Sequence, residues 1–389
     1  MNKSVALVSY SFEKGGAAIA ARRQYQALAR FGGGKVSLVS MREPTSAEAL
    51  PFKLFNRTIF LFNNFISRAL SFLATGNITE KKSINCFSVP FRASKLDKLA
   101  DIVHIHWIHN ETLSLSEIER IQSPVVWTLH DAWLVSAPYH LGQTERLSLV
   151  QRYLRFRIRK LLARKQITFI SPSRFGARLV EDAYGDLISC NVVANAIDTD
   201  IFSPNLGFPA DKNPDILRVA VVIGSGDADF NKGFDLLLAA LEEIVDYKLE
   251  IHLIGSFTSS YHSINHTFIN HGFLYKDFER ANILKNMHVT AIPSRFEMFC
   301  QVACESLSCG TPIAAFSVGG LKEFSDWDTV AGMALPFDST DFARVLCSTA
   351  VTGRNHQVRR TCRAFAIERF SFAAVSAALM GVYATVGSR

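Results

Sequence analysis

The stretch from Ala291 to Phe324 constrains the fold most, because strands, turns and helices alternate within it. His288 to Pro293 is a short apolar run that ends in proline, which is typical of a buried strand. Small and apolar residues at helical spacing predict a helix from Gln301 to Cys309, and the Gly-Thr-Pro that follows ends it. Ile313 to Phe316 is the next predicted strand, and Gly319-Gly320 leads into another helix. This alternation predicts an α/β fold with a parallel sheet.

Two glutamates in this stretch point to a ligand. Glu297 follows a predicted strand, and Glu305 lies about one turn into the next helix. Ligands of open parallel sheets bind at the carboxyl ends of strands, and a helix N-terminus attracts phosphate there. Carboxylates accept hydrogen bonds from sugar hydroxyls. The pattern therefore predicts a site for a phosphorylated, hydroxyl-rich ligand.

The same stretch closely resembles the donor-site motif of the retaining glycosyltransferases of family 4, which have the GT-B architecture. The matching residues are Pro293, Ser294, Glu297, Phe299, Glu305, Ser306, Leu307, Gly310, Pro312, Gly319, Gly320 and Glu323. The resemblance implies an α/β fold with two Rossmann-like domains that face each other across a cleft. The alternative is an ordinary buried helix of a parallel sheet that carries two glutamates by chance.

The length of 389 residues suits two domains. We expect an N-terminal, acceptor-side Rossmann-like domain over 1–204 and a C-terminal donor domain over 205–368. The proline-punctuated stretch from Pro204 to Pro214 is the predicted linker. In the GT-B architecture a C-terminal helix, here 369–389, crosses back to the first domain.

The first predicted strand, Val5 to Tyr10, is followed by Gly15 and Gly16 and then by a helix from Ala18 to Ala29. A glycine loop between a strand and a helix can bring backbone N–H groups to a phosphate. The alternative is a purely structural tight turn. The loop also resembles the first loop of family 4, whose glycines lie near the sugar phosphate and the acceptor.

Histidines follow two other predicted strands of this half, Asp101 to Trp107 and Val125 to Leu129. The second strand ends at His130, and the surrounding sequence resembles a bacterial surface-polysaccharide branch of family 4, which makes O-antigen or exopolysaccharide. There the histidine at the position of His130 lies against the donor sugar. An interior histidine is the alternative, but the place at a strand's carboxyl end argues against it. His104 and His106 share one face, and no third ligand has a matching spacing, so no metal site is expected.

The second half opens with a strand and a loop that ends in Lys232-Gly233. The family has Lys-Gly at this place, with the lysine on the donor diphosphate, and Lys232 can supply that point charge. An arginine often lies near this lysine in the family, whereas this chain has Asn231. We therefore expect Lys232, the helix N-terminus and Arg295 to share the diphosphate.

The resemblance implies a retaining transfer of a hexosyl group from a UDP- or GDP-sugar to a saccharide acceptor. Glu297, His130 and Lys232 are the expected catalytic residues, on the hexose hydroxyls, beside the sugar and on the diphosphate. The expected donor-binding residues are Glu305 (on the ribose), Gly15, Gly16, Asn231, Arg295, Met298, Phe299 and Cys300. The helix N-terminus would stabilise the charge that develops on the leaving diphosphate. No covalent nucleophile, metal or cofactor is expected.

Composition indicates where in the cell this chemistry is expected and which partners the chain favours. No run of 18 uncharged apolar residues predicts a spanning helix, and the N-terminus lacks a signal-peptide cleavage pattern. Seven cysteines without a paired framework fit a reducing cytosol. The net charge of +7 favours anionic partners. Because no nucleic-acid motif occurs, nucleotide phosphates and anionic lipid are the expected anions.

Two basic, apolar stretches, Phe52 to Leu73 and Arg152 to Lys165, contain no acidic residue. Either can lie at a membrane interface, and the alternatives are a core-facing helix and a solvated helix face. The expected apolar stripe of the second stretch is Tyr153, Phe156, Leu161 and Leu162. With the surface-polysaccharide resemblance, these stretches favour a lipid-linked acceptor and a peripheral place on the cytoplasmic face of the bacterial inner membrane.

Three other functions compete with this interpretation. A metal-dependent transferase of the GT-A type would use an Asp-x-Asp pair, and three such tripeptides occur, at 198–200, 227–229 and 326–328. A GT-B-like sugar-nucleotide epimerase would convert the donor without an acceptor. A non-catalytic sugar-nucleotide-binding subunit of a polysaccharide assembly would bind the donor and never turn it over.

Overall fold

The chain is described here from a computed structural model. The described residues are 3–13, 15–40, 61–63, 65–67, 82–85, 92–140, 148–205, 215–258, 261, 263 and 265–386. Most of the predicted helix 52–73, and most of the predicted linker 204–214, lie outside them.

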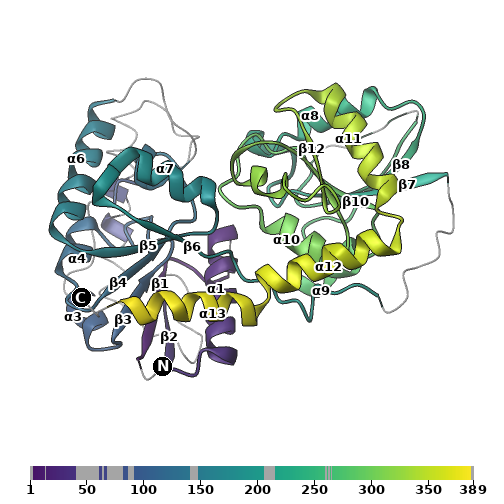
Figure 1. Cartoon of the computed structure of the whole chain (residues 1–389). Coiled ribbons are helices and arrows are strands. Elements are labelled where there is room, and N and C mark those ends of the chain that lie inside the picture. Colours follow the sequence, from purple (N-terminus) through teal and green to yellow (C-terminus); the bar gives the residue numbers. More distant parts are fainter. Residues whose placement is uncertain are drawn as a thin grey trace. The chain divides into compact units, whose positions relative to one another are not determined.

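The chain forms two compact units (Figure 1). Unit 1 comprises Met1–Ala196 and Val375–Arg389, and unit 2 comprises Ile197–Ala374. The C-terminal segment therefore rejoins the unit that contains the N-terminus. No helix in the described part of the chain is long and apolar enough to cross a membrane.

Unit 1 is built on a six-stranded parallel sheet in the order β2-β1-β3-β4-β5-β6. Its strands are β1 (Val5–Ser9), β2 (Val36–Ser40), β3 (Ile102–Ile105), β4 (Val125–Thr128), β5 (Ile167–Ser171) and β6 (Cys190–Val192). Its helices are α1 (Gly16–Phe31), α3 (Arg92–Asp97), α4 (Leu115–Arg120), α5 (Trp133–Ser136), α6 (Leu149–Arg164), α7 (Arg174–Tyr184) and most of α13 (Phe372–Thr385). The strand order reverses between β1 and β3, which is where such sheets bind ligands.

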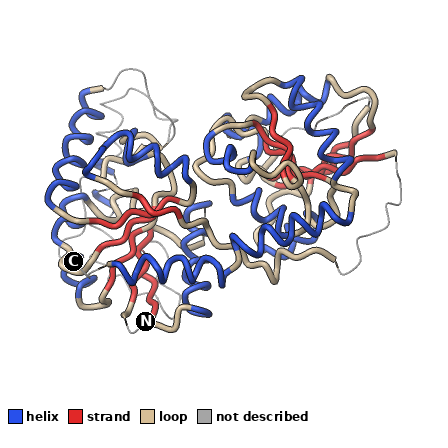
Figure 2. The backbone as a smooth tube through the Cα atoms, in the orientation of Figure 1, coloured by secondary structure: helices blue, strands red, loops and turns tan. Residues whose placement is uncertain are grey.

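Unit 2 repeats this plan with the order β12-β11-β10-β7-β8-β9, and all five pairings are parallel. Its strands are β7 (Ile216–Val222), β8 (Lys248–Ile254), β9 (Thr267–Asn270), β10 (Val289–Ile292), β11 (Ile313–Phe316) and β12 (Ala331–Ala334). Its α-helices are α8 (Phe234–Glu242), α9 (Asp277–Leu284), α10 (Gln301–Ser308), α11 (Ser339–Thr352) and α12 (His356–Phe370). Here the order reverses between β7 and β10. Figure 2 shows the strands of each unit gathered into one sheet with helices around it.

The strands are central because both of their faces are buried and mostly apolar. Every residue of β1, β3, β4, β10 and β11 is buried, as expected for a parallel sheet covered by helices. The prediction of two Rossmann-like α/β units is thus confirmed, and β11 has the predicted bounds.

Two local predictions were wrong in detail. The turn after β1 is shorter than expected, because Gly16 is already the first residue of α1. On α6, the buried stripe is Leu154, Ile158, Leu161 and Leu162. Tyr153 and Phe156, which were expected on the apolar stripe, are 51% and 62% exposed.

Candidate functional site

The loops that follow β7 and β10 bring Lys232 and Glu297 together at the carboxyl edge of the sheet in unit 2. The two strands pair directly, so their following loops are neighbours at the point where the strand order reverses. The Nζ atom of Lys232 lies 2.6 Å from Oε1 of Glu297. The same oxygen accepts a hydrogen bond of 3.0 Å from the Ser294 hydroxyl. Two of the expected catalytic residues therefore form one charged pair.

This pair keeps Lys232 positively charged. Burial alone would lower the pKa of Lys232, but the Glu297 carboxylate outweighs it and raises that pKa above its usual value. The lysine is thus a fixed cation at the sheet edge. An anionic ligand can replace Glu297 as the partner of its ammonium group. Glu297 is 8% exposed, so its carboxylate is held in place by these two partners.

Glycines let two backbone segments pack against the loop that carries Glu297. Gly233 has a φ of +64°, and a Cβ there would overlap the carbonyl oxygen of Pro293. On the other side, a Cβ on Gly319 would overlap the carbonyl oxygen of Glu297, and the N–H of Gly320 donates to that oxygen at 2.8 Å. Only glycine permits approaches this close. The glycines of the motif therefore position the glutamate.

The helix α10 begins directly after this loop. Met298 and Cys300 are buried, and burial raises the pKa of the Cys300 thiol to about 12. Their side chains belong to the core, so we expect these two residues to meet a ligand only through their backbone. The Phe299 ring packs edge-on against Phe370, with 6.0 Å between the ring centroids.

Glu305, the second glutamate of the motif, is buried on α10. Its Oε1 atom lies 3.3 Å from Nη2 of Arg280, which also bonds Asp277 at 2.8 Å. Arg280 therefore balances the charge of Glu305, a partner that the sequence pattern did not indicate.

Arg295 is engaged by a neighbouring helix. Its guanidinium forms a bidentate pair with Asp235, at 2.7 and 2.5 Å, and stacks 3.9 Å above the Phe230 ring. The backbone N–H of Arg295 donates to the carbonyl oxygen of Asn231 at 2.7 Å. A contact of Arg295 with a diphosphate would therefore compete with Asp235.

In unit 1, His130 follows β4 and pairs with His106, which follows β3. Nε2 of His130 lies 3.0 Å from Nδ1 of His106, and the rings are stacked. Burial lowers the pKa of His130 to about 4, against the opposing charge of Asp131. The imidazole is thus neutral at physiological pH and can exchange hydrogen bonds with a sugar hydroxyl.

His104 and His106 do not share a ligand. His104 bonds Tyr383 at 2.6 Å and Thr128 at 2.7 Å, and burial lowers its pKa to about 3. The buried Nε2 atom of His106 has no hydrogen-bond partner among the described residues.

The glycine loop of unit 1 lies at the carboxyl edge of the sheet, after β1. Gly15 has a φ of +99°, and no heavy atom of the described residues, its chain neighbours aside, lies within 4 Å of a Cβ built on it. Gly16 begins α1. Glycine adopts this backbone conformation without strain, and among the described residues nothing prevents a close approach to the turn before α1.

One group of polar residues was missed by the sequence analysis. His109, Asp131 and His140 converge after β3, β4 and α5. The only sequence signal was the presence of histidine and aspartate after neighbouring strands, and His140 lies beyond a further helix.

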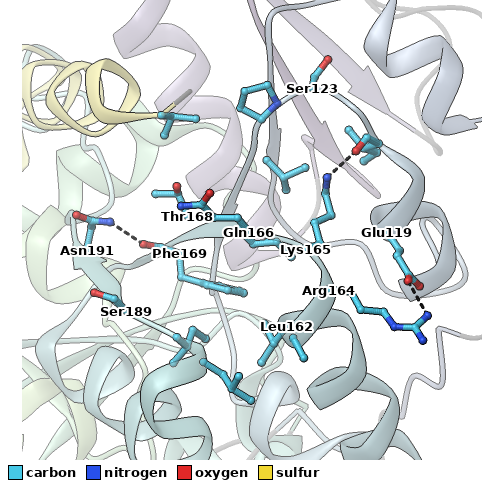
Figure 3. Close-up of a pocket in the computed structure, with 18 of the residues that line it drawn as sticks. Glu119, Ser123, Leu162, Arg164, Lys165, Gln166, Thr168, Phe169, Ser189 and Asn191 are labelled. Carbon is cyan, nitrogen blue, oxygen red and sulfur yellow. Dashed lines mark hydrogen bonds and ion pairs between the residues drawn. The ribbon is translucent and has the colours of Figure 1, made fainter. Parts of the chain in front are cut away.

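A hollow of about 990 Å³ lies at the amino edge of the sheet in unit 1, where β4 and β5 begin, opposite to the carboxyl edge (Figure 3). Three of its charged side chains have partners within the chain: Lys165 bonds the carbonyl oxygen of Ile121 at 2.5 Å, and Arg164 pairs with Glu119 at 3.3 Å. Because ligands of such sheets bind at the carboxyl edge, we do not assign the site to this hollow.

Known families match both units. The model of "Glycosyltransferase Family 4" matches residues 14–201, and the model of "Glycosyl transferases group 1" matches residues 218–350.

Individual proteins are similar at lower identity. A D-inositol 3-phosphate glycosyltransferase of Xylanimonas cellulosilytica is 24% identical over 74% of this chain and 73% of its own length. The putative colanic acid biosynthesis glycosyl transferase WcaC of Escherichia coli is 26% identical over 57% of this chain and 61% of its own length. The structure of HepE of Anabaena, solved in complex with UDP-glucose, has a TM-score of 0.67 at 14% identity and covers 99% of this chain and all of its own. At that identity, the structural likeness shows the GT-B fold alone.

Proposed function

The chain belongs to the glycosyltransferases of family 4, and we propose that it is a retaining enzyme with a nucleotide-diphosphate sugar as its donor. The observation that carries this proposal is the Lys232–Glu297 pair at the strand-order reversal of unit 2. A cation and a carboxylate held 2.6 Å apart can separate to receive a diphosphate and a sugar hydroxyl. The UDP-glucose in the similar HepE structure supports a donor of this class.

In this proposal the donor lies along the carboxyl edge of unit 2. Lys232 and the N-terminus of α10 neutralise the diphosphate, and the helix end stabilises the charge that develops as the sugar leaves. Glu297 accepts hydrogen bonds from the hexose, and Glu305 from the ribose. Asn231 and Arg295, with the backbone from Met298 to Cys300, complete this side, and no metal ion takes part in the transfer.

The proposal also gives roles to residues of unit 1. The neutral imidazole of His130 contacts the donor sugar, and the Gly15-Gly16 turn borders the reaction centre. The lowered pKa of His130 supports a neutral hydrogen-bonding role. We propose a saccharide as acceptor, in bacterial surface polysaccharide synthesis, which the similarity to WcaC supports.

Proton NMR of the sugar released from the donor tests the proposal. Incubated with a panel of UDP- and GDP-sugars without acceptor, the protein should hydrolyse one of them slowly. The first sugar formed should keep the anomeric configuration of the donor, and added Mg²⁺ or Mn²⁺ should leave the rate unchanged. A product of inverted configuration would refute retention. A donor that binds but is never cleaved, even with a lipid-linked acceptor, would favour a non-catalytic subunit.

We further propose that α6 docks on an anionic membrane surface, which would place a lipid-linked acceptor within reach. The helix carries basic residues and no acidic one, and its exposed face combines aromatic and basic side chains. Tyr153 and Phe156 are exposed, as are Arg152, Arg159 and Lys160. This combination suits a lipid interface, where rings enter the headgroup region and cations meet lipid phosphates.

Replacing Arg152, Arg159 and Lys160 together by glutamine should weaken binding to vesicles rich in anionic lipid. Each basic residue contributes on the order of 1 kcal/mol at such a surface, so the partition coefficient should fall roughly 100-fold. Sedimentation with the vesicles measures it.

The matched control removes three exposed basic residues of unit 2, Lys248, Lys322 and Arg360, and so changes the net charge equally. It should bind vesicles like the unmodified chain. Equal loss in both variants would show an unspecific charge effect and remove α6 from the proposal.

A further inference from the structure

Three side chains that can bind a metal ion converge in unit 1. Nδ1 of His140 lies 2.6 Å and Nε2 of His109 lies 3.7 Å from Oδ2 of Asp131. The three ligand atoms all lie within 4.8 Å of one another. Both histidines are buried, whereas the Asp131 side chain is 20% exposed. The cluster is therefore enclosed on most sides and reachable from solvent at the carboxylate.

The ring nitrogens that point away from the cluster also have polar neighbours. Nε2 of His140 lies 3.0 Å from the Ser83 hydroxyl, and Nδ1 of His109 lies 3.0 Å from Nδ2 of Asn85. Histidines that bind metals almost always have such an outer partner, which fixes the ring and its tautomer. Here both imidazoles are held with one nitrogen toward Asp131.

The Asn85 side chain gives an independent indication of the tautomer. Asn85 is fully buried, yet its Oδ1 atom has no hydrogen-bond partner among the described residues. An unsatisfied buried oxygen is costly, and the two ends of an amide are told apart only by their hydrogen bonds. Turning this amide over lets Oδ1 accept from Nδ1–H of His109. The Nε2 lone pair of His109 then points into the cluster, as a cation requires.

The Asp131 carboxylate is also held in place by hydrogen bonds from outside the cluster. Oδ1 of Asp131 accepts from the backbone N–H of Trp133, and Oδ2 accepts from the Trp107 indole, both at 3.0 Å. Asp131 is therefore held with Oδ2 facing the two imidazoles.

We propose that His109, Asp131 and His140 bind a Zn²⁺ ion, with water in the fourth position. Two imidazoles and one carboxylate are a recognised zinc ligand set. The ion would link the segments after β3, β4 and α5, and it would hold Asp131, the residue next to His130. It has a positioning role, separate from the donor diphosphate in unit 2.

The observed spacing fits this proposal with a small movement. A separation of 2.6 Å is that of a charge-assisted hydrogen bond. Two ligands of a tetrahedral zinc ion, each about 2.0–2.1 Å from it, lie roughly 3.3 Å apart. Zinc would thus replace the proton between His140 and Asp131, and their side chains would separate by less than about 1 Å.

The test begins with the whole protein, stripped of metal by a chelator and dialysed. Zn²⁺, titrated against a chromophoric competitor, should bind at one ion per chain, and saturation should raise the melting temperature by about 5 °C. Co²⁺ in its place should give the visible absorption of a tetrahedral site without thiolate-to-cobalt charge-transfer bands. Those bands would place the metal on cysteine and overturn the proposal, as would failure to bind.

Variants then identify the ligands. His109→Gln and His140→Asn each keep a polar atom near the nitrogen that binds, and each should weaken Zn²⁺ binding at least tenfold. The control His356→Gln removes an exposed histidine of unit 2 and should bind like the unmodified chain. Unchanged affinity in either cluster variant would overturn the proposal. The cobalt spectrum of the unmodified protein decides the matter if a variant fails to fold.

Discussion

Replacing Glu297 by alanine should lower the turnover of the nucleotide-sugar donor by roughly 100- to 1,000-fold, the loss typical of an oriented group that stabilises a transition state. The change removes the acceptor for the sugar hydroxyls. It also leaves Lys232 without its 2.6 Å partner, so the burial that lowers the pKa of that lysine acts with less opposition. Both effects weaken the arrangement that receives the donor. Release of nucleoside diphosphate measures the loss.

Two further variants separate this effect from general damage. Glu297→Gln keeps the shape of the side chain and one acceptor oxygen, so its loss should be smaller. Glu242→Gln removes an exposed carboxylate from α8 and should leave turnover unchanged. If Glu297→Ala turns over the donor like the unmodified chain, with its melting temperature unchanged, Glu297 has no role in the reaction.

Replacing Gly233 by alanine should destabilise unit 2 by about 3 kcal/mol, because two costs add. Alanine is strained at a φ of +64°, and its Cβ would overlap the carbonyl oxygen of Pro293. The loop that carries Glu297 begins directly after Pro293, so the displacement should also reduce donor turnover. The unfolding transition, followed by calorimetry, should move down by roughly 10 °C.

Gly224→Ala is the matched control in the loop after β7. The nearest atom to a Cβ there is on the Phe273 ring, at 3.6 Å, an ordinary contact. Its melting temperature should stay near that of the unmodified chain. If the Gly233→Ala protein has the same melting temperature as this control, the chain relieves the close approach to Pro293 at little cost.

The fold could be predicted because strands buried on both faces are continuous apolar runs that end in glycine, proline or polar residues. The stretch from Val289 to Ile292 is such a run, and its following loop was predicted to carry a ligand-binding glutamate. The same reasoning placed His130 at the end of a strand and Lys232 in the loop that leads from a strand into a helix. Their roles came from resemblance, and these roles stay predictions.

Pairings between distant side chains could not be predicted in this way. Arg295 meets Asp235, and Glu305 meets Arg280, because β10 lies beside β7 and α9 lies beside α10. The spacing of residues along the chain does not show which strands and helices lie side by side. The cluster of His109, Asp131 and His140 was missed for the same reason, since its members come from three separate segments.

The exposed face of α6 was within reach of the sequence. Leu154, Ile158, Leu161 and Leu162 recur at the spacing of one helix face, and they are the buried residues. Ranking residues by apolar character alone placed Tyr153 and Phe156 on the wrong face. In a stretch where aromatic residues alternate with arginines, only the helical period shows which residues lie on the buried face.

The most direct test of the central claim asks where the nucleotide binds. Backbone amide hydrogen exchange of the whole protein should be measured with and without saturating UDP or GDP. A donor site at the carboxyl edge of unit 2 predicts slower exchange in residues 231–236 and 298–304. No slowing there, or slowing confined to 121–125 and 164–169 around the hollow of unit 1, would contradict the account.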